Sequence, residues 1–224
     1  MIKKFIQKAI KILPDEILNG SGSVIYSSKE TLRPGKYYIL GFNPGGNAED
    51  NKSTVLNSLN DFSARKKNAY LDERWKSNSG EYEIGEHPLQ RHLVEVMKTI
   101  GQDLRDVCAS NLIFLRSPGH YGVKYPASAK DCWGIHEMIL EIVQPRIILA
   151  FGNGPRSPYN FLLHKYNAYE STSIDCKPGS KWKCRFFKTK IQDREASVIG
   201  LPHLSRYSIK NKDMVVKWIK GLTT

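Results

Sequence analysis

GFNPGG, residues 41–46, directly follows the apolar run YYIL at residues 37–40. That run has the length and the aromatic and branched side chains of a buried strand, so the glycines begin where a strand ends. Glycine lets the backbone approach a ligand closely, Pro44 stiffens the turn, and Asn43 places one polar side chain at its centre. Loops at the carboxyl ends of strands bind ligands in open α/β sheets. An ordinary turn in which Asn43 caps its own backbone is the alternative.

Apolar strands and amphipathic helices alternate along the rest of the chain. The strands are expected near residues 107–115, 146–151 and 197–201, and the helices at 2–13, 88–100, 128–143, 158–165 and 214–222. Alternation of this kind predicts parallel strands joined by helical crossovers. We therefore expect an α/β fold with three α/β/α layers around a central, mostly parallel four-stranded sheet.

The 224 residues are expected to form one domain, residues 1–224, with three distinctive segments. Residues 1–14 hold a basic amphipathic helix that Pro14 ends, and residues 47–87 form a polar, variable insertion. Residues 172–190 alternate basic and apolar side chains around a turn, which predicts a hairpin with one basic face.

The charge balance favours an anionic partner. The net charge is +12 and the isoelectric point is near 9.5, which favours nucleic acid first and an anionic membrane second. No apolar run is long enough to span a bilayer, and lysines interrupt the N-terminal segment, so we expect neither a membrane span nor a signal peptide.

The positive charge is concentrated late in the chain. Residues 176–220 contain twelve lysines and arginines against three acidic residues, a net of +9. Lys181, Lys183 and Arg185 lie among aromatic residues, and Arg206 follows the last strand. This pattern is typical of a surface that follows phosphates and stacks on bases. The aromatic residues are Trp182, Phe186 and Phe187.

Cysteine and histidine positions give no metal pattern. Cys108 and Cys132 lie in apolar segments, and no cysteine pair has the spacing of a zinc or iron–sulfur site. We therefore expect a cytoplasmic (intracellular) protein with no metal and no cofactor. His136 lies on the apolar face of a helix and is expected to be a hydrogen-bonded core histidine.

Three motifs, in this order, resemble those of the uracil-DNA glycosylase superfamily: GFNPG (41–45), SNLIFLRSP (110–118) and LPHLSR (201–206). The first resembles the mismatch-specific and single-strand-selective branches, which carry an asparagine there. The last resembles a motif in which histidine and serine follow the final strand. Leu204 stands where that motif usually has proline. The stacking aromatic of the family cannot be aligned, and its candidates are Phe62, Tyr70 and Trp75.

The resemblance implies a DNA glycosylase that flips uracil or a related damaged base out of DNA and hydrolyses its N-glycosidic bond, in base excision repair. Asn43 would position the attacking water, His203 would donate to the base carbonyl, and Asn111 would match the base edge. The base-binding set is Phe42, Gly45, Asn111 and Tyr70. The DNA-binding set is Lys181, Lys183, Arg185, Leu204 (as a wedge), Ser205 and Arg206.

Other interpretations stay open on the sequence alone. Asn111 could satisfy a purely structural hydrogen bond, and His203 could be a loop histidine bound to a carboxylate. The protein could bind nucleic acid without catalysis while keeping the glycosylase fold, or could be a nucleotide-handling hydrolase on a similar sheet. The expected partner is single- or double-stranded DNA, and the expected state is a monomer without membrane contact.

Overall fold

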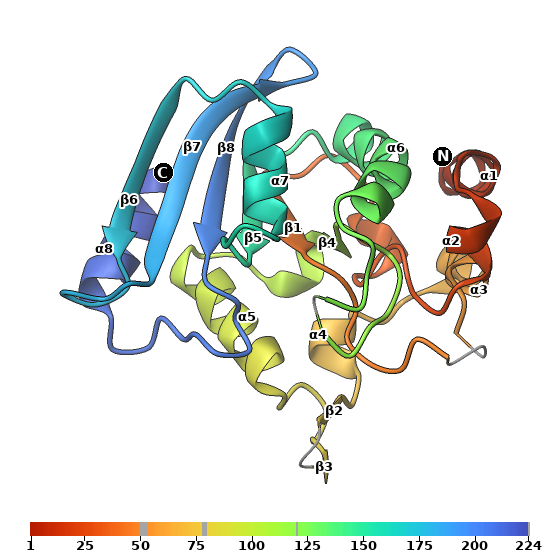
Figure 1. Ribbon diagram of the computed structural model, residues 1–224, viewed down its shortest axis with the longest axis horizontal. Coiled ribbons are helices and arrows are strands. Elements are labelled where there is room, and N and C mark those ends of the chain that lie inside the picture. The colour runs from red at the N-terminus through yellow and green to blue at the C-terminus, as the bar shows by residue number, and fades with distance from the viewer. Residues whose placement is uncertain (50–52, 78–79, 120, 224) are drawn as a thin grey trace.

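The computed structural model in Figure 1 describes residues 1–49, 53–77, 80–119 and 121–223. Residues 50–52 and 78–79 of the predicted insertion lie outside the described residues, as do 120 and 224. The helices are α1 (Ile2–Ile12), α2 (Asp15–Asn19), α3 (Val55–Asp61), α4 (Ala69–Asp72), α5 (Pro88–Thr99), α6 (Ala127–Val143), α7 (Pro158–Lys165) and α8 (Asp213–Thr223). The strands are β1 (Tyr37–Gly41), β2 (Lys76–Ser77), β3 (Gly80–Glu81), β4 (Cys108–Asn111), β5 (Ile147–Phe151), β6 (Glu170–Asp175), β7 (Lys183–Ile191) and β8 (Arg194–Leu201).

The central sheet contains six described strands in the order β4-β1-β5-β8-β7-β6. Strands β4, β1, β5 and β8 are parallel to one another, whereas β7 is antiparallel to β8 and β6 is antiparallel to β7. The predicted α/β fold with a mostly parallel sheet is confirmed. The predicted number of four strands is wrong, because the basic hairpin joins the sheet.

Strands β6 and β7 extend the sheet beyond β8. The pairing runs from Arg185 opposite Gly200 to Ile191 opposite Arg194. Without it, β8 would be an edge strand with unpaired backbone groups. Phe186 and Phe187 point to opposite faces, and both are buried because helices cover both faces. The sequence predicted a hairpin with one basic face at residues 172–190 but did not count it among the strands of the sheet.

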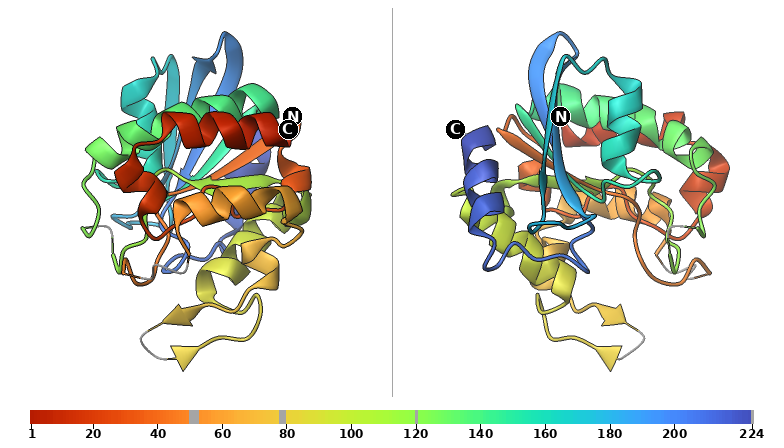
Figure 2. Two further views of the ribbon diagram at one scale, coloured as in Figure 1. Left: turned by 90° about the vertical axis from the view of Figure 1, so that its right-hand side faces the viewer. Right: turned by 60° about the vertical axis from the view of Figure 1, so that its left-hand side comes forward.

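Helices cover the sheet on both sides, as Figure 2 shows. Residues of α1, α6 and α7 form one buried cluster with Tyr38 and Leu40. Residues of α5 and α8 form a second cluster with Tyr37 and Ile39. Alternate residues of β1 therefore pack into the two cores on opposite faces of the sheet, which explains the unbroken apolar sequence of the strand.

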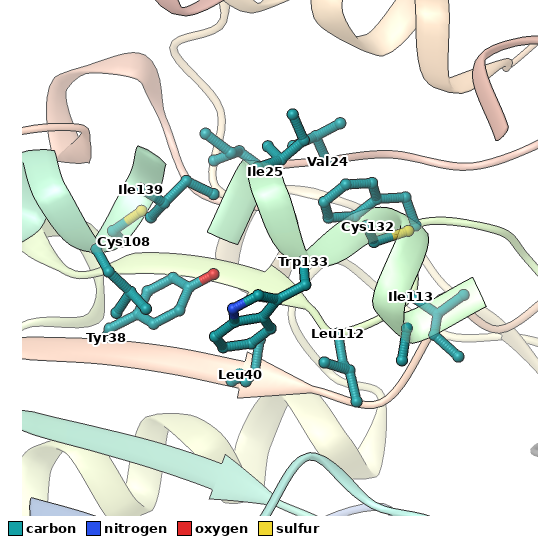
Figure 3. Packing of buried hydrophobic residues seen from close by; sticks show 14 of the residues in the cluster. Val24, Ile25, Tyr38, Leu40, Cys108, Leu112, Ile113, Cys132, Trp133 and Ile139 are labelled. Atoms are coloured by element: carbon teal, nitrogen blue, oxygen red, sulfur yellow. The ribbon is translucent and has the colours of Figure 1, made fainter. Parts of the chain in front are cut away.

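The core beneath α6 also contains a buried histidine. Figure 3 shows Tyr38 and Trp133 close together near Leu40 and Leu112 in this core. The Nδ1 atom of His136 accepts a 2.9 Å hydrogen bond from the Tyr38 hydroxyl, and its Nε2 donates to the carbonyl of Leu112 at 3.2 Å. The ring is fully buried, and burial lowers its pKa to about 4. The predicted role of His136 as a hydrogen-bonded core residue is confirmed.

Two segments that gave weak sequence signals have short elements of structure. Residues 15–36, where the sequence pattern predicted neither helix nor strand, contain α2. The insertion at 47–87 contains α3, α4 and the β2–β3 hairpin, which projects from the body of the protein (Figure 1). Tyr26 donates its backbone N–H to Ala109, so the segment before β1 covers the outer edge of β4.

Candidate functional site

Four parallel strands end in a common row. Asn111, Gly41, Phe151 and Leu201 close β4, β1, β5 and β8 at the same level of the sheet. The chain forms β1, then β4 on one side of it, then β5 on the other side. The direction of winding thus reverses between β1 and β5, and open α/β sheets bind ligands in the crevice beside such a reversal. The glycine loop at residues 42–46 leaves the sheet at this point.

The side chains of Asn111 and Phe151 pack against the backbone of Gly41 at the strand ends. A β-carbon on Gly41 would lie 2.1 Å from Oδ1 of Asn111 and 2.5 Å from Cζ of Phe151. The ring of Phe151 also meets the ring of His203 edge-on, with centroids 5.8 Å apart. Phe151 therefore lies between Asn111 and His203, and the chain brings these two predicted site residues into one neighbourhood.

Asn111 is nearly buried at the end of β4. Its exposed fraction is 4%, and its side-chain amide makes no hydrogen bond to any of the residues that the structure describes. Its amide atoms are not among the fully enclosed, unpaired side-chain atoms of the described residues, so they reach the surface of the protein. The described part of the chain thus supplies no hydrogen-bond partner that would support the structural alternative for Asn111. The amide offers two donors and one acceptor to a ligand.

Asn43 is held in one orientation by its own loop. Its Nδ2 lies 2.9 Å from the carbonyl of Pro44, 3.3 Å from that of Leu115 and 2.8 Å from Oγ of Ser117. These acceptors fix which end of the amide is the nitrogen, so Oδ1 is the atom available to accept a hydrogen bond. Asn43 therefore joins the loop after β1 to the loop after β4. The alternative, in which Asn43 stabilises its own turn, explains the hydrogen bonds of Nδ2.

His203 follows β8 and is exposed. Its Nδ1 accepts from the backbone N–H of Ser205 at 3.3 Å and lies 2.8 Å from the Ser205 hydroxyl. A backbone N–H can only donate, so the neutral ring carries its proton on Nε2. Ser205 thus sets the tautomer that can donate a hydrogen bond, and it is a positioning residue for His203.

The neighbouring leucine does not project from the loop. Leu204 is fully buried in the core formed with α5 and α8, so its expected insertion into a DNA groove does not fit this conformation. Its carbonyl accepts a 2.6 Å hydrogen bond from Nδ1 of His92, which anchors the loop to α5. In this chain Leu204 anchors the loop by packing. Arg206 is exposed, as a phosphate contact requires.

The predicted aromatic candidates are mostly enclosed. Tyr70 is 1% exposed and packs against Phe151 at 6.4 Å between centroids, so it supports that ring and does not present a stacking face. Phe62 packs on Phe5, and Trp75 lies between Tyr70 and His87. Burial raises the pKa of Tyr70 well above its usual value.

The two other predicted base contacts lie on the loop after β1. Phe42 is buried against Tyr125 on the α6 side of the sheet, and its carbonyl accepts from the backbone of Ile113 at 2.9 Å. Gly45 is exposed, and its carbonyl accepts from Nη1 of Arg116 at 3.2 Å. The backbone of this loop is therefore tied to the segment that follows β4.

Cross-strand ion pairs neutralise part of the basic hairpin. Lys183 lies 3.2 Å from Asp175, and Lys188 lies 2.9 Å from Glu170. Lys181 and Arg185 are exposed, and neither forms an ion pair within the described ranges. Of the predicted aromatic partners, Phe186 and Phe187 are buried, so the prediction that they form a stacking surface is wrong.

Sequence reasoning missed a pair of buried polar groups near the glycine loop. The hydroxyl of Tyr26 and Nε of Arg116 have no hydrogen-bond partner in the part of the chain that the structure describes. Burial raises the pKa of Tyr26 to about 12, against the opposing effect of the Arg116 charge. Arg116 lies within the SNLIFLRSP motif, and a basic residue just beyond a strand end was the available signal.

Two surface hollows lie away from this row. One is lined by residues around Pro34 and Asp106, and the other by residues around Tyr166 and Lys190. No group of three or more potential metal ligands occurs among the described residues. Within the same residues, none of the helices combines the length and apolar character needed to cross a bilayer.

Comparison of the chain with models of protein families and with curated proteins finds no match. The resemblance to the glycosylase superfamily therefore rests on the three motifs, and the site rests on the geometry described above.

Proposed function

We propose that the protein is a DNA glycosylase that hydrolyses the N-glycosidic bond of uracil or a related damaged base flipped out of DNA. The observation that carries the proposal is the side-chain amide of Asn111, which has no hydrogen-bond partner among the described residues. It lies beside Gly41 in the row of strand ends, next to the winding reversal, and the Phe151 ring lies between it and His203. An amide without a partner in the protein is able to form its hydrogen bonds to a ligand.

Uracil has the complementary chemistry. Its edge offers a carbonyl acceptor beside an N–H donor, which matches one donor and the acceptor of the Asn111 amide. As the bond to the sugar breaks, negative charge develops on the base. The proton on Nε2 of His203, set by the Ser205 contacts to Nδ1, is suited to donate to a base carbonyl as that charge grows.

Asn43 would act on the water. An amide is too weak a base to remove a proton, so its contribution is geometric. The three acceptors around Nδ2 hold Oδ1 in a fixed position, from which it can accept a hydrogen bond from the attacking water. Fixing this one atom favours attack over free diffusion of the water.

The test is incubation with oligonucleotides that carry uracil, hypoxanthine, xanthine or a thymine mismatch, followed by alkaline cleavage of abasic sites. Wild type is expected to release at least one base. Asn43→Ala and His203→Ala are each expected to abolish release while DNA affinity stays within about a factor of ten. His164→Ala is the matched control, because His164 is exposed at the end of α7, a helix that does not carry the site.

A second candidate function is nucleic-acid binding without catalysis. Two observations favour it: the Nδ2 contacts of Asn43 are structural, and the two hollows found lie elsewhere. Under this alternative, wild type binds DNA tightly yet releases no base from the panel. The same experiment thus decides between the two functions.

A further inference from the structure

We infer that Trp182 stacks on an unpaired base next to the candidate site, so that the protein prefers single-stranded DNA over duplex. This inference rests on the proposed action on nucleic acid, and it concerns the form of the substrate. Stacking on an aromatic side chain is how proteins bind single strands without reading their sequence.

Trp182 is exposed where the other aromatic residues of its segment are not. Its exposed fraction is 49%, whereas Phe186 and Phe187 are both at most 1% exposed. It lies in the turn between β6 and β7, two residues before Cys184. Side chains alternate along an extended chain, so Trp182 is expected on the same side as Cys184, which packs in the core that contains Phe151.

The turn is at the same edge of the sheet as His203. Arg185 of β7 pairs with Gly200 of β8, so residues before Arg185 extend past the end of β8 at Leu201. Neighbouring strands are about 4.8 Å apart, which places the start of β7 beside the loop that carries His203. A strand of DNA with one nucleotide at His203 can therefore bring a flanking base to Trp182.

The backbone around Trp182 is fixed before any ligand binds. Its carbonyl accepts from Cys176 at 2.8 Å, and its N–H donates to Oγ of Ser180 at 3.1 Å. Asn153, in the loop after β5, donates to the carbonyls of Lys183 at 2.7 Å and Gly200 at 2.9 Å. A surface held in its binding conformation loses less entropy when it binds.

The charge of the turn and the burial of Leu204 favour single-stranded DNA over duplex as the ligand. Lys177 and Lys181 lie in the turn, and neither forms an ion pair in the described ranges, so both can neutralise phosphates. With Leu204 buried, the loop after β8 lacks its expected wedge for opening a duplex. A single strand offers unpaired bases without the cost of opening a base pair.

The test is fluorescence anisotropy with a labelled 12-nucleotide thymine oligonucleotide and with its matched duplex. Wild type is expected to bind the single strand more tightly. Trp182→Ala is expected to weaken single-strand binding about tenfold, which is 1.4 kcal/mol, and Trp182→Phe to retain most of it. Tyr169→Ala is the matched control: Tyr169 is 56% exposed, precedes β6 and should have no effect.

Equal binding by wild type and Trp182→Ala would overturn the inference, as would tighter binding of the duplex. Melting curves for both variants ensure that a loss reflects the side chain, and retention by Trp182→Phe identifies the ring as the cause. Base release from the lesion panel reports separately on the proposed function. A protein that binds single strands through Trp182 but releases no base would refute only the glycosylase proposal.

Discussion

The core beneath α6 and the row of strand ends differ in whether a polar side chain is hydrogen-bonded to the protein. His136 is fully buried, and both its ring nitrogens are hydrogen-bonded. Asn111 is 4% exposed, and its amide has no partner in the described part of the protein. The carbonyl that His136 contacts belongs to Leu112, the residue after Asn111. His136 therefore has a structural role, whereas a binding role is what we propose for Asn111.

The largest expected effect comes from removing the amide of Asn111. Asn111→Ala should lower kcat/KM for base release by about 10²–10³-fold, because it removes hydrogen bonds to the departing base. It should not lower the melting temperature, since the amide makes no hydrogen bond to the described residues. Single-turnover kinetics and calorimetry on one preparation measure both quantities. A drop in melting temperature as large as that of a His136 variant would assign Asn111 to the structure.

For His136 we expect the reverse: a loss of stability without a loss of base release. His136→Ala should destabilise the protein by about 3–4 kcal/mol, because it opens a cavity and leaves the Tyr38 hydroxyl and the Leu112 carbonyl unpaired. Urea unfolding measures the loss. Base release per folded molecule should stay unchanged. A change of less than 1 kcal/mol would show that these hydrogen bonds contribute little.

The pH dependence of stability sharpens the same contrast. The pKa of His136 is about 4 in the folded protein and 6.5 in an unperturbed chain, so the unfolded state takes up the proton first. Stability from this group is complete above about pH 6.5 and falls by about 3 kcal/mol as the pH drops toward 4. Urea titrations across this range should show the loss in wild type. A His136→Gln variant that kept the same slope would contradict the assignment.

The smallest expected effect concerns Gly41. Gly41→Ala should cost about 1–3 kcal/mol, because the added carbon would meet Asn111 and Phe151 at 2.1 and 2.5 Å. Gly45→Ala is the matched control in the same loop, since no atom lies within 4 Å of its added carbon. Thermal unfolding compares the two. Equal melting temperatures would mean that the row of strand ends is loosely packed.

Sequence periodicity predicted most of the fold. The α6 and α7 helices and the ends of β1 and β5 follow apolar patterns that depend on local spacing. The membership of β6 and β7 in the main sheet was missed. It depends on a pairing between Arg185 and Gly200 that no local pattern encodes.

The site was predictable in its positions and less so in its side-chain environments. Asn43, Asn111 and His203 were identified because each lies at or just beyond a strand end. The burial of Leu204 and Tyr70 was not predictable, because it depends on α5 and α8 packing over the strand ends. Exposure of Trp182 also follows from tertiary packing and not from residue type.

The measurement that tests the central claim most directly is single-turnover release of free base from a uracil-containing single strand, detected by mass spectrometry. The account predicts that wild type liberates uracil and that the Asn111→Ala protein, folded to the same degree, does so at least a hundredfold more slowly. Equal rates for the two proteins, or no uracil from wild type bound to the strand, would contradict it.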